Sequence, residues 1–232
     1  MRRLSLQIFS VGLFVIVGFT ALSQTTAEEK DPFARWEKSI AQMEEQDAKS
    51  KPAAGGVLFV GSSSIRLWDL HKSFPYDKPL NRGFGGSELA DSTHFAARII
   101  IPHKPKKVFL YAGDNDIAKG KSAETVHEDY LKFVQKVHAK LPDAEIIFIA
   151  IKPSIKRWEL VGEMRKANGL IEAETKKREK LAYADIDKPM IGDDGLPRKD
   201  LFLKDGLHLN EAGYKVWNNV MAPFFKDGSK SN

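Results

Sequence analysis

The sequence predicts an α/β fold built around one parallel sheet of about five strands. Short, almost wholly apolar runs recur along the chain, as expected of strands that are buried on both faces. Between these runs lie longer stretches whose apolar residues recur every three or four positions, which is typical of helices with one buried face. Strands that alternate with helices form parallel sheets, and ligands bind beyond the carboxyl ends of such strands. We therefore look for chemistry in the segments that follow each strand.

The elements can be predicted in chain order. Asp31 and Pro32 signal the start of a helix, with Asp31 as the cap and Pro32 in the first turn. The predicted strands are residues 57–60, 79–84, 108–111, 146–151 and 182–186. The apolar stripes of the predicted helices are Phe33, Trp36, Ile40 and Met43; Val126, Tyr130, Phe133, Val137 and Leu141; Leu160, Met164, Ala167 and Ile171; and Trp217, Val220 and Phe224.

Residues 1–23 have the pattern of a secretion signal. Arg2 and Arg3 precede an apolar run at residues 8–22, and small residues follow, so we expect cleavage after residue 23 or as late as residue 27. This predicts an exported protein, periplasmic or extracellular, with no stable membrane insertion after signal removal. The alternative is an uncleaved N-terminal membrane anchor, although the run is short for a span. The remaining organisation is a spacer with a helix packed on the domain (24–56), the main domain (57–226) and a polar tail (227–232).

The composition excludes several kinds of function. The chain has no cysteine, which rules out disulfides, thiolate metal sites and cysteine nucleophiles. The formal charge is +5 and would be +3 without Arg2 and Arg3, and basic residues are interleaved with acidic ones, as at residues 176–180. Such a charge pattern is typical of solvated helix faces, so we expect no nucleic-acid partner.

Three serines, Ser62, Ser63 and Ser64, follow the first predicted strand and Gly61. A helical pattern begins there, so one of them lies at a helix N-terminus, where backbone N–H groups and the helix dipole favour a developing anion. This place suits a nucleophile whose adduct becomes an oxyanion. Serines also cap helices, so this segment alone leaves both interpretations open. A phosphate loop is a third interpretation, but its Gly-Lys-Ser/Thr ending is missing.

Two further segments follow the next strands. The second strand leads into a stretch with three glycines in four residues, which lets the backbone turn sharply and approach a ligand. The third strand leads into Gly113-Asp114-Asn115-Asp116, where the Asn115 amide could donate a hydrogen bond into the same crevice. The alternatives here are an Asx turn and a calcium loop, although calcium usually needs a longer run of ligands.

Asp205 precedes His208 by three residues near the C-terminus. The carboxylate can accept from one ring nitrogen while the other nitrogen takes a proton from a serine. A metal pair is the rival interpretation, but no third histidine or carboxylate lies nearby at ligand spacing. We therefore expect neither a metal nor a cofactor.

Together these four segments resemble the SGNH hydrolases, also called the GDSL-type esterase and lipase family, over roughly residues 57–225. That family carries, in this order, a nucleophilic serine after the first strand, a glycine, an asparagine in Gly-x-Asn-Asp, and Asp-x-x-His near the end. The chain looks closest to the single-domain bacterial members that are similar to platelet-activating-factor acetylhydrolase subunits. The resemblance implies a three-layer αβα sandwich of the flavodoxin-like kind.

Motif position assigns a role to each of five residues. The resemblance implies that Ser63 is the nucleophile and that Asp205 and His208 complete the triad. It also implies an oxyanion hole made by the backbone N–H groups of Ser63 and Gly86 and the side-chain amide of Asn115.

Two positions leave alternatives to these assignments. Gly85 could substitute for Gly86, because both lie in the same glycine-rich turn. Ser62 stands where the family usually has aspartate, which leaves the choice of nucleophile among Ser62, Ser63 and Ser64 open.

The resemblance implies hydrolysis of carboxylic esters or thioesters through an acyl-enzyme. Arg157 and Trp158 follow the fourth strand and should border the crevice, where Arg157 could meet an anion and Trp158 could stack on a sugar or merely pack on the domain. We expect a small-molecule or carbohydrate acyl ester as substrate, with acetylated sugars first. The alternatives are a lysophospholipase or thioesterase type of acylhydrolase, and a non-catalytic carbohydrate-binding module on the same fold.

Overall fold

A computed structural model describes residues 31–225 of the chain. The chain divides into a unit of Met1–Asp31 and a unit of Pro32–Asn232, and the second unit contains the sheet and its helices. The predicted signal (1–23) and polar tail (227–232) lie outside the described residues. Within residues 31–225, no helix has both the length and the apolar character that crossing a membrane requires.

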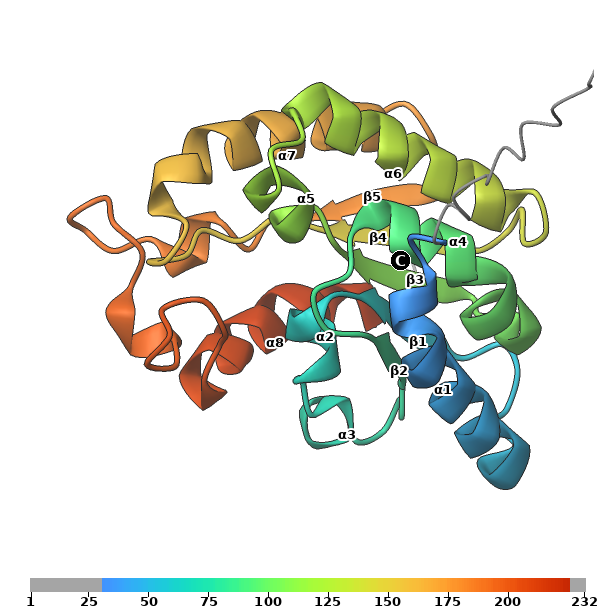
Figure 1. Cartoon of the computed structure of the whole chain (residues 1–232). Coiled ribbons are helices and arrows are strands. Elements are labelled where there is room, and N and C mark those ends of the chain that lie inside the picture. The colour runs from blue at the N-terminus through green and yellow to red at the C-terminus, as the bar shows by residue number, and fades with distance from the viewer. Residues whose placement is uncertain (1–30, 226–232) are drawn as a thin grey trace, which may run out of the picture. The chain divides into compact units, whose positions relative to one another are not determined.

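Five parallel strands form a single sheet in the order β2-β1-β3-β4-β5 (Figure 1). The strands are β1 (Val57–Gly61), β2 (Leu80–Gly83), β3 (Lys107–Tyr111), β4 (Glu145–Ile149) and β5 (Leu181–Ala184). This confirms the predicted α/β fold and its five strands. The order places β1 inside the sheet, as in flavodoxin-like folds, and all the carboxyl ends meet at one edge.

Helices connect the strands and cover both faces of the sheet (Figure 1). They are α1 (Glu37–Ser50), α2 (Ser63–Arg66), α3 (Leu70–Ser73), α4 (Leu89–Ile99), α5 (Asp114–Ala118), α6 (Ala123–His138), α7 (Val161–Thr175) and α8 (Glu211–Phe225). Short 3-10 turns are η1 (Ala34–Trp36), η2 (Ile101–His103), η3 (Trp158–Leu160), η4 (Lys188–Met190) and η5 (Lys199–Leu201).

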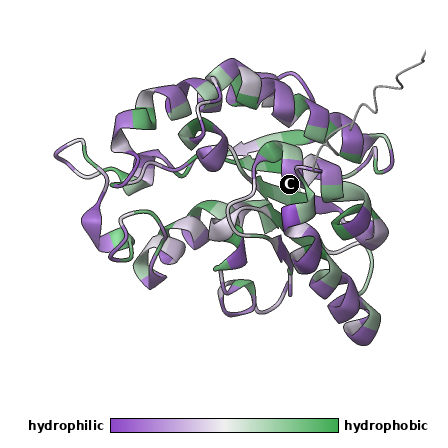
Figure 2. Ribbon diagram, in the orientation of Figure 1, coloured by the Kyte–Doolittle hydropathy of each residue, from purple (hydrophilic) through white to green (hydrophobic). Residues whose placement is uncertain are grey.

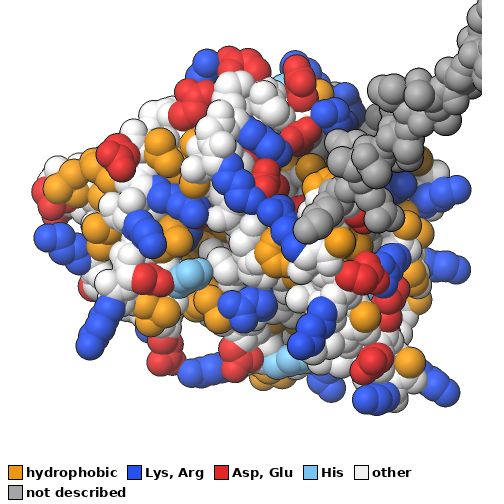
Figure 3. Space-filling model, viewed as in Figure 1, with side chains coloured by type: hydrophobic (Ala, Val, Ile, Leu, Met, Phe, Trp, Pro, Cys, Tyr) orange, Lys and Arg blue, Asp and Glu red, His pale blue; other side chains and the backbone are white. Residues whose placement is uncertain are grey.

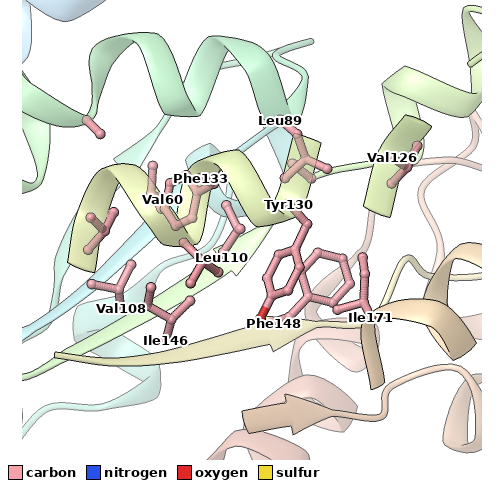
Figure 4. Close-up of a cluster of buried hydrophobic side chains, with 14 of the residues drawn as sticks. Val60, Leu89, Val108, Leu110, Val126, Tyr130, Phe133, Ile146, Phe148 and Ile171 are labelled. Atoms are coloured by element: carbon pink, nitrogen blue, oxygen red, sulfur yellow. The ribbon is translucent and has the colours of Figure 1, made fainter. Parts of the chain in front are cut away.

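The alternation of side chains along each strand produces two hydrophobic cores. Val60, Leu110 and Phe148 point to the face covered by α1, α4, α6 and α7, and Figure 4 shows this core. Phe59 and Phe109 point to the other face, which is covered by α2, α3 and α8. Both faces of every inner strand are therefore buried, and the covering helices carry many hydrophilic residues, drawn in purple in Figure 2.

The first helical turn starts later than the sequence predicts. Helical structure begins with η1 at Ala34, and its N-cap position is Phe33 rather than Asp31. The Phe33 ring stacks on His94 of α4 with ring centroids 3.9 Å apart, so a tertiary contact sets the start of the helix. Farther along, Ile40 of α1 is fully buried in the core.

Candidate active site

The first strand ends in a turn that only glycine permits. Gly61 has a φ of +134°, and a Cβ atom there would lie 1.8 Å from the carbonyl oxygen of Tyr111 on β3. The next residue, Ser62, donates its backbone N–H to that same carbonyl over 3.0 Å. Because β1 stops against β3 in this way, α2 begins at Ser63, at the carboxyl edge of the sheet.

The three consecutive serines lie in different surroundings. Ser62 and Ser64 are each 2% exposed, whereas Ser63 is only partly buried. The Oγ atom of Ser63 lies 3.0 Å from Nε2 of His208. The hydroxyl of Tyr214 donates to the backbone carbonyl of Ser64 over 2.9 Å, which fixes the backbone next to Ser63. The geometry therefore singles out Ser63.

Asp205 and His208 form a compact pair on the loop before α8. Nδ1 of His208 lies 2.6 Å from Oδ2 of Asp205, while Oδ1 accepts the backbone N–H groups of Leu207 and His208, each over 2.9 Å. The bond from the His208 ring, followed by the bond from Leu207, holds the pKa of Asp205 well below its usual range. An ionised carboxylate only accepts, so Nδ1 carries the hydrogen and the Nε2 lone pair faces Ser63.

The segments predicted to form the oxyanion hole each offer a hydrogen-bond donor. The N–H groups of Ser63 and Ser64 open α2, so they have no acceptor within that helix. Gly86 is exposed, and its backbone N–H has no acceptor among residues 31–225. Asn115 donates one Nδ2 hydrogen to the carbonyl of Ser87 over 3.0 Å, which places its amide beside the glycine-rich turn.

The segment around Asn115 is helical rather than a simple loop. Asp114–Ala118 form α5, and Asp116 lies in its first turn. The Asp116 carboxylate accepts the backbone N–H groups of Gly113 and Leu89 over 3.1 and 3.3 Å. Burial dominates and raises the pKa of Asp116, against the opposing effect of Lys121. Asp116 therefore fastens the Asn115 turn to the start of α4.

Arg157 and Trp158, the two predicted substrate contacts, both interact with other side chains of the protein. Arg157 donates to Oδ1 of Asp114 over 2.5 Å and to Oδ1 of Asn115 over 3.1 Å. The guanidinium of Arg165 lies over the Trp158 ring, 5.6 Å from the ring centroid. The structure thus brings Arg157 to the Asn115 amide and places Trp158 against α7.

A buried charged cluster next to Asn115 was not expected from the sequence. Lys152 is 1% exposed and donates to Oδ2 of Asp114 over 2.9 Å and to the Tyr111 hydroxyl over 3.2 Å. The one available signal was a lysine directly after the apolar run 146–151. A charged residue at the carboxyl end of a buried strand points to the crevice of such a sheet.

The charged side chains of residues 31–225 do not form a candidate metal site. Within residues 31–225, no group of three or more histidine, aspartate or glutamate side chains has an arrangement suited to a metal ion. Basic and acidic side chains are intermixed over the face shown in Figure 3.

A parallel α/β sheet with a hydrogen-bonded Ser–His–Asp chain beyond its carboxyl edge has the arrangement of a serine hydrolase. The model of the GDSL-like lipase/acylhydrolase family matches residues 65–216. The chain belongs to this family.

Individual proteins show the same likeness. The chain is 33% identical over 123 residues to the platelet-activating factor acetylhydrolase IB subunit beta homolog of Drosophila melanogaster, which covers 52% of each protein. The chain therefore spans about half the length of that curated relative.

Solved structures share the fold. A Streptococcus pneumonia protein described as a candidate platelet activating factor superposes with a TM-score of 0.73 at 20% identity, covering 82% of this chain and 92% of the other. A carbohydrate esterase family 3 protein from Talaromyces cellulolyticus superposes with a TM-score of 0.59 at 17% identity, covering 73% and 95%.

Proposed function

We propose that the protein is an exported esterase that removes short acyl groups, acetyl first, from carbohydrates through an acyl-enzyme on Ser63. The observation that carries the reaction is the continuous chain of hydrogen bonds from Ser63 through His208 to Asp205. Its three members come from the end of β1 and from the loop before α8.

The reaction follows from this geometry. Nε2 of His208 takes the Ser63 hydroxyl proton as Oγ attacks the acyl carbonyl carbon, and the carbonyl oxygen becomes an oxyanion. The N–H groups of Ser63 and Gly86 and the Asn115 amide donate to that oxyanion. When the carbonyl reforms, the C–O bond to the alcohol breaks and His208 gives its proton to the leaving oxygen. Water then repeats these steps on the acyl-enzyme and releases the acid.

A surface cavity beside the triad segments supports a polar substrate. Its volume is about 630 Å³, and its wall runs from Leu67, four residues after Ser63, to Leu209, directly after His208. The polar members of its lining include Asp69, Lys72, Ser73, Asn210, Glu211, Tyr214, Lys215 and Asn218. The amides and charges of this wall can exchange hydrogen bonds with the hydroxyl groups of a sugar. The family 3 carbohydrate esterase, which shares the fold, supports the same substrate class.

One observation favours a second candidate, an acylhydrolase for longer acyl chains such as a lysophospholipase or thioesterase. Leu67 and Leu203 line the same cavity, and they are 41% and 50% exposed. Large apolar side chains exposed in a surface cavity provide contact area for an alkyl chain. A sugar substrate would contact the polar residues of this cavity, whereas a long acyl chain would contact Leu67 and Leu203.

A panel of esters separates these candidates. The full chain is assayed with p-nitrophenyl acetate, butyrate and octanoate, with acetylated xylo-oligosaccharides, and with lysophosphatidylcholine, with Ser63→Ala as the blank. We expect kcat/KM to fall as the acyl chain lengthens, and acetate to be released from the oligosaccharides. A rise of kcat/KM toward octanoate would favour the second candidate. Binding of the oligosaccharide without turnover of any ester would instead indicate a carbohydrate-binding module.

Export rests on the first 23 residues. Their charged start, apolar run and small residues support a cleaved signal, and we propose that the mature chain begins between Gln24 and Glu28. N-terminal sequencing of protein from the culture medium or periplasm tests this. Intact Met1 on membrane-bound protein would overturn it in favour of an anchor.

A further inference from the structure

Two opposite partners fix the orientation of the Asn115 side chain. Its Nδ2 donates to the carbonyl oxygen of Ser87 over 3.0 Å, and its Oδ1 accepts from Nη2 of Arg157 over 3.1 Å. A carbonyl oxygen can only accept, and a guanidinium can only donate. A flipped amide would therefore lose both bonds and face repulsion on both sides. One Nδ2 hydrogen remains without an acceptor among residues 31–225 and is available to an oxyanion.

Arg157 is itself held by a buried anion. Its Nη1 donates to Oδ1 of Asp114, while Oδ2 of Asp114 accepts from Lys152 and from the Tyr111 hydroxyl. Burial alone would raise the pKa of Asp114, but the two cations outweigh it and hold that pKa below its usual range. The cluster therefore contains two positive charges and one negative charge, with the guanidinium bonded directly to the Asn115 amide.

From these contacts we propose that Arg157 is a positioning residue for ester hydrolysis: it locks the Asn115 amide in its donating orientation and polarises it toward the oxyanion. The proposal rests on the proposed function, because it requires Asn115 to donate to the oxyanion. Arg157 acts only through Asn115 and touches no substrate.

The chemistry of arginine suits this role. Its planar fork bonds Asp114 through one Nη atom and Asn115 through the other, which a single ammonium group cannot reproduce with the same geometry. A charged donor on Oδ1 also draws electron density from the amide, which makes the remaining N–H a stronger donor, since bonded chains polarise one another. Both effects grow in importance as charge develops on the carbonyl oxygen.

The competing role for Arg157 is to bind an anionic group of the substrate. That role predicts a change in KM for anionic esters and no change for neutral ones. The positioning role predicts a fall in kcat even for a neutral ester, because misplaced catalytic groups slow the chemical step. A neutral ester such as p-nitrophenyl acetate therefore separates the two roles.

The experiment compares Arg157→Gln and Arg157→Lys with wild type on p-nitrophenyl acetate. We expect kcat to fall about ten- to a hundredfold with KM within about twofold, and Arg157→Lys to recover only part of the loss. Arg165→Gln is the matched control, because Arg165 pairs with Asp187 and lies over Trp158 without a bond to Asn115. Unchanged kcat in Arg157→Gln, or an equal loss in Arg165→Gln, would overturn the proposal.

A double-mutant cycle distinguishes positioning from a general loss of structure. In the Asn115→Ala background, Arg157→Gln should change kcat by less than about twofold, because the amide it positions is gone. A full additional loss in that background would overturn the proposal, whatever the melting temperatures show. If Asn115→Ala alone leaves kcat unchanged, the oxyanion role in the proposed function fails first, and the two failures remain distinguishable.

Discussion

The two halves of the catalytic arrangement are held in different ways. The half where we propose that negative charge develops, at Ser63 and Asn115, is fixed by segments distant in sequence: Asn115 bonds to Ser87 and Arg157, 28 and 42 residues away. The half that we propose moves the proton, at Asp205 and His208, is a turn whose two members are three residues apart. One half depends on tertiary structure, and the other depends mainly on its own backbone.

The two halves also differ in their exposure to water. Asp114, Asp116 and Lys152 behind Asn115 are buried, whereas the Asp205 and His208 side chains are 41% and 27% exposed. Electrostatic interactions are stronger away from water, so the buried half is suited to stabilising an oxyanion. The exposed half can exchange protons and admit water. The comparison indicates that substitutions in the buried half should affect folding and catalysis together, and those in the exposed half mainly catalysis.

The largest expected effect on activity comes from removing the hydrogen bond between Ser63 and His208, which joins the two halves. Ser63→Ala removes the oxygen that faces His208, so ester hydrolysis should fall at least about a thousandfold, and Ser63→Ala/His208→Ala should fall no further. The neighbouring variants Ser62→Ala and Ser64→Ala should keep most of the activity. A fluorophosphonate probe followed by peptide mapping checks the assignment. A label on Ser62 or Ser64 would contradict it.

Asn115 gives the next largest effect, within the buried half. Asn115→Ala removes one oxyanion donor, which should cost about 2.7–4 kcal/mol, a hundred- to a thousandfold in kcat with little change in KM. Asn115→Asp should be at least as damaging, because it brings a negative charge to the oxyanion and removes a donor.

Steady-state kinetics on both Asn115 variants, with melting temperatures as the control for folding, tests this expectation. Near-normal kcat in a folded Asn115→Asp protein would mean that Asn115 only joins its segment to its neighbours and does not donate to the oxyanion.

A smaller effect is expected in the exposed half, at Gly206. This residue lies between Asp205 and His208 with a φ of +65°, and an added Cβ would lie 3.1 Å from Cβ of Ile155. A side chain in this backbone region costs roughly 1–2 kcal/mol, so Gly206→Ala should shift the turn and lower kcat about tenfold. Gly162→Ala in α7 is the matched control, because the added Cβ would meet open space. Equal kcat in the two variants would show that the turn tolerates displacement.

The smallest effect concerns the contribution of Asp205 to stability. The pKa of this carboxyl is lower in the folded protein than in the unfolded chain. Its stabilisation is therefore fully present above the unfolded pKa of about 3.9 and is lost as the pH falls through the folded value. Because Asp205 is well exposed, Asp205→Asn should lower the free energy of unfolding at pH 7 by at most about 1 kcal/mol.

Urea unfolding at pH 7, 5 and 3 measures this contribution. The difference between Asp205→Asn and wild type should shrink below pH 4. Asp114→Asn is the matched variant in the buried half, and it should cost roughly 3–5 kcal/mol at pH 7, because it leaves the buried Lys152 and the half-buried Arg157 without their anion. A similar loss in both variants would remove the distinction between the halves.

The sequence predicted the fold and the spacing of the site because both depend on local patterns. Runs of apolar residues mark the buried strands, and Asp205 and His208 are brought together by a turn of four residues. The parallel topology then places the ends of β1 and β3 at one edge. These features need no knowledge of long-range contacts.

The remaining features depend on contacts that no local pattern specifies. The bond from Arg157 to Asn115 depends on how the segment after β4 folds back over α5, so the sequence suggested only that Arg157 would border the crevice. The start of η1 follows the packing of Phe33 on His94 rather than the Asp31-Pro32 signal. The carbonyl of Ser87 is a backbone group, whose partner no residue type reveals.

The order of the strands has a consequence for how activity is acquired during synthesis. From β1 the sheet extends through β3, β4 and β5 in the order in which a ribosome delivers them, so each new strand finds its neighbour already present. His208, however, arrives 145 residues after Ser63. A growing chain can thus complete its five-stranded sheet before His208, the base that we propose for Ser63, has been made. We therefore expect hydrolytic activity to appear only after the sheet has formed.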